Sequence, residues 1–180
     1  MDPRWEKLGT LLVNYSTKVR PGERVMIAMM EPETFPLAQA VYRAVIKAGG
    51  FPQVQFLSET MRHSLLRFGT KEQIDWVPEI EAQGMEWADV YIGLRGAHNL
   101  YELQDIDAEV LAINQKAMGK ISTMRWEKTR WVVIRVPNES FAQSAQTDCE
   151  TIMDMFFDSC FLDWEEELKN LNAWAEKLNR

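Results

Sequence analysis

The sequence predicts an α/β fold, in which a mostly parallel sheet of about four or more strands has helices on both faces. Four short apolar runs are separated by stretches in which apolar residues recur with helical spacing. The runs are continuously apolar, which is typical of parallel strands buried on both faces. Strand–helix–strand units with right-handed crossovers build the layers of Rossmann-like and flavodoxin-like domains. The predicted strands are Arg24–Met30, Gln53–Leu57, Val90–Leu94 and Arg130–Val136.

The first third of the chain contains two helices on this interpretation. The first helix lies within residues 1–19. Pro3 suits its first turn, because the missing N–H of proline costs nothing there. A turn at Pro21–Glu23 leads into the first strand. The second helix covers Leu37–Ala48, and Gly49-Gly50 ends it, as glycine commonly does after a helix.

The middle and the end of the chain contain further helices. Residues 58–68 form either a helix or an ordered loop, and Thr70 with Gln73 matches a capping box, so a helix begins at Lys71. Pro78 ends or kinks that helix. Three more helices are predicted near the C-terminus: Asp107–Met118 with a stop at Gly119, one that opens at the capping box Thr147–Glu150 and runs through Phe157, and Asp163–Leu178.

Length and composition predict one soluble domain. The 180 residues are 46% hydrophobic and 26% charged, as in ordinary globular proteins. A formal charge of −7 argues against a nucleic-acid partner, because phosphate binding needs a basic face. No apolar run approaches the roughly 20 residues of a membrane span, and the first residues lack the apolar core of a signal peptide. Cys149 and Cys160 are expected to be buried free thiols, so the predicted location is cytoplasmic.

Candidate functional residues follow the predicted strands, because ligands of such sheets bind beyond the carboxyl ends of the strands. Four segments lie there: Met30–Glu33, Ser58–Thr60, Arg95–Asn99 and Pro137–Ser140. The third offers a cation in Arg95, an imidazole in His98 and an amide in Asn99, and these three residues are candidates for catalysis. His98 could act as acid or base and Asn99 as an oxyanion donor. The alternative is an ordinary polar loop whose side chains cap backbone groups.

Nucleotide cofactors and a metal site within this chain are not indicated. No glycine-rich phosphate loop follows the first strand, and neither GxGxxG nor GxxxxGK[ST] occurs. His63 and His98 are the only histidines, and neither belongs to a zinc-binding spacing. We therefore expect neither a cofactor nor a metal ion to be bound by this chain, and a surface or capping role for His63.

Seven tryptophans and ten methionines predict an interaction surface. We expect most of the tryptophans in the core and the remainder, with methionine, in an exposed patch that contacts another chain. The last helix, residues 163–178, has an apolar stripe and no following element in the sequence to cover it. The predicted partner is another protein chain, in a homo- or hetero-oligomer.

Several segments in order match one family. They are Leu11–Val25, Pro36–Gly50, Ala88–Ile92 with Asn99, and Arg130–Pro137 with Phe141–Ala145. This set resembles the amino-terminal domain of the thermophilic metallo-aminopeptidases, the leucyl aminopeptidases that include aminopeptidases T and S. The resemblance covers about residues 2–178. It departs from the family pattern at Ser140–Thr147, which lacks the Gly-Met-Ser that the family often has there.

The resemblance implies a two-domain relative whose second domain binds two divalent metal ions. Arg180 falls about where that domain would begin, so residues 1–180 are expected to be a single α/β domain without the metal-binding second domain. Three alternative functions follow. The first is an amino-terminal domain or subunit of a metal-dependent aminopeptidase-like protein whose partner supplies the metal site. Alternatively, it is a non-catalytic binding or scaffold protein descended from that domain. The third is a small metal-free enzyme that uses Arg95, His98 and Asn99.

Overall fold

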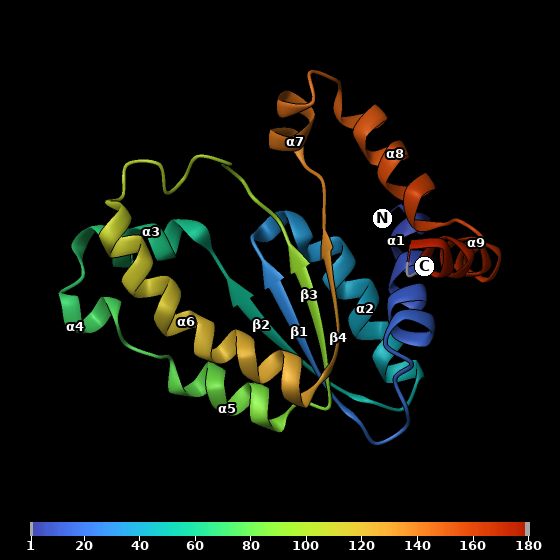
Figure 1. Ribbon diagram of the computed structural model, residues 1–180, viewed down its shortest axis with the longest axis horizontal. Helices are drawn as coiled ribbons and strands as arrows, with labels where there is room; N and C mark the ends of the chain where they lie inside the picture. Colours follow the sequence, from blue (N-terminus) through green and yellow to red (C-terminus); the bar gives the residue numbers. More distant parts are fainter. Residues whose placement is uncertain (1, 179–180) are drawn as a thin grey trace.

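A four-stranded, all-parallel sheet forms the centre of the computed structural model, which describes residues 2–178 (Figure 1). The strand order is β2-β1-β3-β4, the order of flavodoxin-type sheets. The winding therefore reverses between the adjacent strands β1 and β3. The predicted α/β fold with a parallel sheet is confirmed. The strands are β1 Arg24–Met30, β2 Phe51–Leu57, β3 Val90–Arg95 and β4 Arg130–Arg135.

Helices cover both faces of the sheet (Figure 1). Side chains alternate along β1: Val25 and Ile27 pack with α1, α2 and α8, whereas Met26 and Ala28 pack with α5 and α6. The α-helices are α1 Pro3–Leu11, α2 Phe35–Lys47, α3 Glu59–Phe68, α4 Lys71–Ile74, α5 Glu79–Trp87, α6 Ala108–Lys128, α7 Glu139–Ser144, α8 Cys149–Cys160 and α9 Trp164–Leu178. A π-helical turn, Leu12–Ser16, continues α1, and a 3₁₀ turn, Pro32–Thr34, precedes α2.

Close packing joins α1, α2 and α8 into one layer. Gly9 of α1 lies against α2 so closely that a Cβ atom would be 2.8 Å from the carbonyl carbon of Ala40. Phe157 of α8 is 1% exposed, and its ring meets that of Trp5 edge-on at 4.7 Å. The guanidinium of Arg4 lies 4.4 Å from the Phe157 ring centre. This aromatic cluster fixes α8 against the body of the domain.

Some predicted helix limits were wrong. Gly119 does not end α6, which continues to Lys128 with helical backbone at that glycine. The continuation is stabilised because Ile121 is buried against the sheet, in a cluster with Met26 and Tyr91. Helix α5 was not predicted as a separate element. The N-cap of α8 is Asp148, one residue after the predicted Thr147, because the Asp148 carboxylate accepts a 2.8 Å hydrogen bond from the N–H of Thr151.

The expected burial of tryptophan and cysteine was also wrong. Trp5 is the one buried tryptophan among the described residues, whereas four are well exposed and lie on separate elements. These four are Trp76, Trp126, Trp131 and Trp174. Cys149 is exposed and Cys160 half-buried, although both thiols are free as predicted. Indole rings tolerate exposure when one face packs on a neighbour, and Trp126 and Trp131 both lie beside the Arg125 guanidinium.

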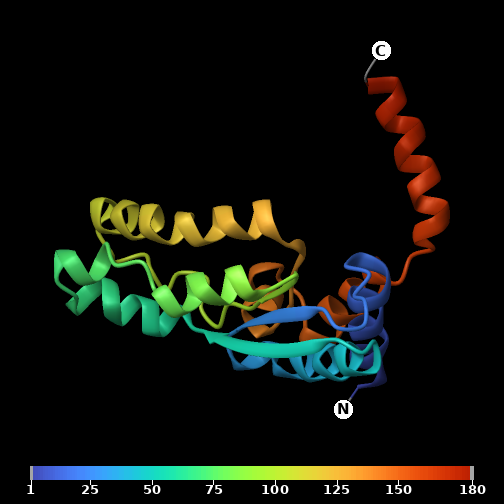
Figure 2. The same ribbon diagram turned by 90° about the horizontal axis from the view of Figure 1, so that it is seen from below.

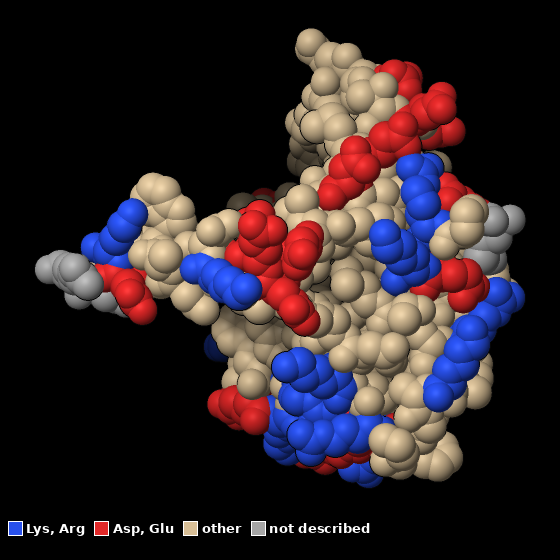
Figure 3. Space-filling model, turned by 90° about the vertical axis from the view of Figure 1, so that its right-hand side faces the viewer, with Lys and Arg blue, Asp and Glu red and all other residues tan. Residues whose placement is uncertain are grey.

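Helix α9 leaves the body of the domain and extends away from it (Figure 2). The predicted helix is confirmed, and none of its described side chains is buried. Its first turn is attached through the Trp164 indole, which donates a 3.0 Å hydrogen bond to the Cys160 carbonyl. Figure 3 shows the helix protruding with charged and uncharged side chains exposed. Within residues 2–178, no helix combines the length and the apolar character needed to cross a membrane.

Candidate functional site

The four predicted segments meet at the carboxyl end of the sheet. Glu31, after β1, accepts hydrogen bonds from the Ser58 hydroxyl and the Glu59 N–H, after β2. The loop after β3 is held in turn by α7, after β4. The Asn138 amide donates a 2.8 Å hydrogen bond to the Ala97 carbonyl, and the Ser140 hydroxyl donates to the His98 carbonyl. All four segments therefore form one connected surface around the winding reversal between β1 and β3.

Glu31 occupies an unusual backbone conformation in this surface. Its φ of 64° and ψ of 153° lie in a region that residues with a Cβ rarely adopt. Four hydrogen bonds keep Glu31 in this conformation. Two are the bonds to its buried carboxylate described above. In the other two, its N–H donates to the Leu57 carbonyl and its own carbonyl accepts from the Thr34 N–H. Strained backbone kept in place by surrounding contacts is concentrated at functional sites. The strained backbone of Glu31 therefore marks this surface as a candidate site.

His98 pairs with Glu33 across the reversal point. The His98 Nδ1 atom lies 2.6 Å from Glu33 Oε1, and the imidazole is otherwise exposed. The hydrogen bond and the negative charge of Glu33 raise the pKa of His98 above its ordinary value. The second carboxylate oxygen of Glu33, Oε2, is buried and has no hydrogen-bond partner among the described residues. An imidazole held by a carboxylate in this way can serve as a general acid or base.

Gly96 allows this pairing, because it brings the loop after β3 against the loop after β1. A Cβ atom on Gly96 would lie 2.8 Å from the Met30 carbonyl oxygen and 2.9 Å from the Thr34 methyl. Any side chain would therefore separate the two loops. This glycine lies next to Arg95 in the sequence, and the position of His98 opposite Glu33 depends on it.

Arg95 and Asn99 lie beside a groove of about 290 Å³ on the same surface. Glu59, Glu102 and Arg135 also line it, so its walls carry both signs of charge. The Asn99 side chain is occupied within its own turn: Oδ1 accepts from the Tyr101 N–H, and Nδ2 donates to Glu102. Arg95 forms no ion pair with a described carboxylate. The sequence thus placed the loop Arg95–Asn99 after β3. The contacts of Glu31 with the segment after β2, and of Glu33 with His98, are seen only in the structure.

The described residues do not fit a metal ion. Between residues 2 and 178, no group of three or more histidine, cysteine, aspartate or glutamate side chains could hold one. Glu33 and His98 supply a free carboxylate oxygen and an imidazole, but a third donor is missing. His63, the other histidine, pairs separately with Asp105 at 2.8 Å, and its side chain is 19% exposed.

Sequence reasoning missed a second group of polar residues on the opposite face of the sheet. Arg125 and Ser122 of α6 and Glu81 of α5 line a cavity with Arg95. Ser122 and Arg125 were missed because α6 was predicted to end at Gly119, and Glu81 because α5 was not predicted as a separate element. The spacing of Met118, Ser122 and Arg125 places them on one helical face, which is the signal that could have identified them.

Comparisons with known proteins agree with this fold. A family model described as thermophilic metalloprotease (M29) matches residues 1–180. The chain belongs to this family. The solved structure of wild-type AmpT from Thermus thermophilus is similar in fold, with a TM-score of 0.73 and 16% sequence identity. The match covers 96% of this chain and 49% of AmpT, so the chain spans about half the length of that relative.

Other comparisons add no functional information. The CurK enoyl reductase structure aligns with 91% of this chain and 49% of its own, at 10% identity and a TM-score of 0.34. No curated protein matches the sequence significantly. The predicted resemblance to the metallopeptidase family is therefore confirmed by the family model. The catalytic roles of Arg95, His98 and Asn99 stay predictions.

Proposed function

We propose that this chain is the amino-terminal α/β domain or subunit of a metal-dependent aminopeptidase-like protein and assembles with a partner that supplies the metal site. The observation that carries the proposal is the family match over residues 1–180, combined with coverage of about half of AmpT. In this proposal, the surface around Glu33 and His98 forms one wall of the substrate cleft. Its charged groove would contact polar parts of a peptide.

The exposed stripe of α9 supports assembly with another chain. Leu168, Leu171 and Leu178 follow one another at intervals of three and seven residues, and they are 46, 53 and 84% exposed. Trp164 and Ala175 complete the stripe with heptad spacing. Covering such a face removes apolar surface from water, which is the main favourable contribution to association. Trp174, which is 63% exposed, lies beside the stripe and extends the proposed contact surface.

The central experiment measures metal content and peptidase activity. The purified chain is analysed for bound zinc, cobalt and iron, and then assayed on leucine p-nitroanilide with each metal added. We expect substoichiometric metal and no hydrolysis from the chain alone. Hydrolysis should appear when a family polypeptide that carries metal ligands is added. Stoichiometric metal with activity in the chain alone would overturn the proposal.

A pair of α9 variants tests the assembly surface. Leu171→Glu places a carboxylate in the apolar stripe, whereas Ala173→Glu places the same charge on the opposite side of the helix. Both side chains are exposed, so neither variant should unfold the domain. Sedimentation of each variant with the metal-binding polypeptide should show association lost only for Leu171→Glu. Equal association of the two variants would exclude α9 as the contact.

The alternatives from the sequence predict different results. A metal-free enzyme that uses the loop after β3 would hydrolyse substrate without added metal, and His98→Ala would abolish that activity. A scaffold protein would associate through α9 without restoring hydrolysis in the mixture. The same set of measurements therefore separates the three functions.

A further inference from the structure

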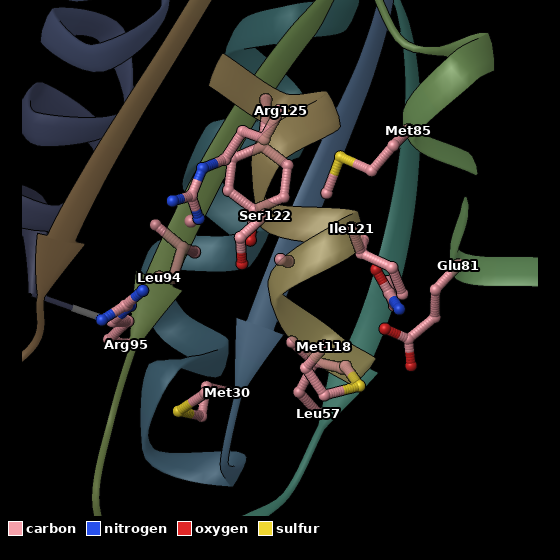
Figure 4. A pocket seen from close by; sticks show the side chains of 14 residues that line it. Met30, Leu57, Glu81, Met85, Leu94, Arg95, Met118, Ile121, Ser122 and Arg125 are labelled. Atoms are coloured by element: carbon pink, nitrogen blue, oxygen red, sulfur yellow. The ribbon is translucent and has the colours of Figure 1, made fainter. Parts of the chain in front are cut away.

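A small cavity lies between the sheet and the helices α5 and α6, on the face opposite α1 and α2. Its volume is about 130 Å³. Figure 4 shows Arg125 and Arg95 toward one side and Glu81 on the other, with Ser122 between them. This cavity is distinct from the groove described above, although Met30 and Arg95 line both. Nothing in the proposed peptidase function uses it.

Arg125 is the unusual residue of this cavity. The residue is only 8% exposed, and its Nε atom is buried without a hydrogen-bond partner. No carboxylate among residues 2–178 forms an ion pair with it. A buried cation without a counter-charge is unfavourable, because water is removed and no anion replaces it. Among the described residues, the Nε–H is therefore left as an unused donor inside the protein.

Three aromatic rings hold the Arg125 guanidinium in position. Its central carbon lies 5.3 Å from the ring centres of Tyr91 and Trp131 and 5.8 Å from that of Trp126. Aromatic faces attract the cation but accept no in-plane hydrogen bonds from its N–H groups. The Tyr91 hydroxyl supplies no negative charge, since burial raises its pKa above the ordinary value. The arginine is thus fixed in place, and its buried Nε–H is the donor available to a ligand.

The remaining walls define the chemistry of that ligand. Arg95 is a second guanidinium without an ion pair among the described residues, and the Ser122 hydroxyl adds a further donor. Guanidinium groups bind carboxylates and phosphates through paired hydrogen bonds. Met30, Met85 and Met118 line the space beyond these donors, and methionine adapts its shape to hydrocarbon chains. An apolar chain attached to the anion fits these walls better than an inorganic phosphate does.

We propose that this cavity binds a small aliphatic carboxylate, with the carboxylate at Arg125 and Arg95 and the hydrocarbon chain against the methionines. Glu81 lies on the opposite side of the cavity from the two arginines and is half-buried. It disfavours a second negative charge at the far end of the ligand. Monocarboxylates are therefore selected over dicarboxylates of the same length.

The test uses the full chain and isothermal titration with 4-methylpentanoate as the probe. Its neutral analogue, 4-methylpentanamide, should bind at least about 10-fold more weakly, because hydrogen bonds to charged groups are the stronger ones. Inorganic phosphate should bind more weakly than 4-methylpentanoate. No detectable binding of 4-methylpentanoate overturns the proposal, and so does equal affinity for the amide. Tighter binding of phosphate contradicts the role of the apolar walls.

Variants assign the binding to these residues. Arg125→Gln should abolish binding, but it removes a buried side chain, so its fold is checked by circular dichroism. Arg95→Gln alters an exposed side chain and should weaken binding by about 10-fold without affecting the fold. Arg20→Gln removes an equal charge from an exposed turn outside the cavity and should leave affinity unchanged. Unchanged affinity in Arg95→Gln, or equal losses in the Arg95 and Arg20 variants, overturns the assignment.

Discussion

Two glycines in helices should respond in opposite ways to the same substitution. At Gly119, a Cβ atom would have no neighbour within 4 Å, and the backbone is helical. Alanine there should stabilise the protein by about 0.5–1 kcal/mol, because glycine costs roughly that much in a helix interior. At Gly9, alanine gains the same helical preference, but its Cβ would lie 2.8 Å from the Ala40 carbonyl carbon and 2.9 Å from the Val41 nitrogen.

The contacts at Gly9 decide the sign of its effect. Both atoms belong to the α2 backbone, so relief requires α1 and α2 to move apart rather than a side chain to rotate. Overpacking of this kind costs about 1–3 kcal/mol. We therefore expect Gly9→Ala to lower the free energy of unfolding by about 1–2 kcal/mol after the helical gain is included.

Urea unfolding followed by circular dichroism measures both variants. The midpoint should rise for Gly119→Ala and fall for Gly9→Ala, with an unchanged slope that indicates the same exposed surface on unfolding. In thermal unfolding, each kcal/mol should shift the midpoint by about 2–4 °C for a chain of this size. Destabilisation by Gly119→Ala would refute a continuous α6, and stabilisation by Gly9→Ala would refute the close contact of α1 with α2.

Two further predictions concern the aromatic cluster and the pair of His98 with Glu33. Phe157→Ala should lower the free energy of unfolding by about 3–5 kcal/mol, because it empties a fully buried aromatic site. The control Phe68→Ala, at a 79% exposed position, should change it by less than about 0.5 kcal/mol. Comparable urea midpoints for the two variants would contradict this prediction. Glu33→Gln should lower the pKa of His98 toward its ordinary value in an NMR titration. Because the folded pKa is raised, the pair stabilises the fold below the unfolded pKa, about 6.5, and this contribution is lost as pH rises through the folded pKa. An unchanged His98 titration would exclude the pairing.

The sheet was predictable because its strands are continuous apolar runs. Strand β1 was located at Arg24–Met30, and the first residues of β2 were missed because Phe51 and Pro52 lie directly after the glycines that end α2. The strand order was not predictable, since pairing between distant segments depends on which helices cover each face. Helix α6 was predicted too short because the intrinsic cost of Gly119 was visible in the sequence, while the burial of Ile121 against the sheet was not.

The position of the candidate site at the end of the sheet could be predicted, but the contacts between its side chains could not. Parallel strands bring their carboxyl ends to one edge, so the loop after β3 could be singled out. The partner of His98 could not be, because Glu33 lies 65 residues away and meets it only across the winding reversal. The sequence did not indicate the positive φ of Glu31 either, because a positive φ is normally predicted at glycine.

Because α9 points away from the domain, the shape of the particle in solution reports whether another chain covers this helix. A helix of 15 residues is about 22 Å long, whereas a compact chain of this size has a radius of gyration of about 16 Å. The free domain should therefore scatter X-rays as an elongated particle with a long maximum dimension. When another chain covers α9, the particle becomes larger in mass but rounder in profile. Small-angle scattering can thus follow engagement of this helix without any label.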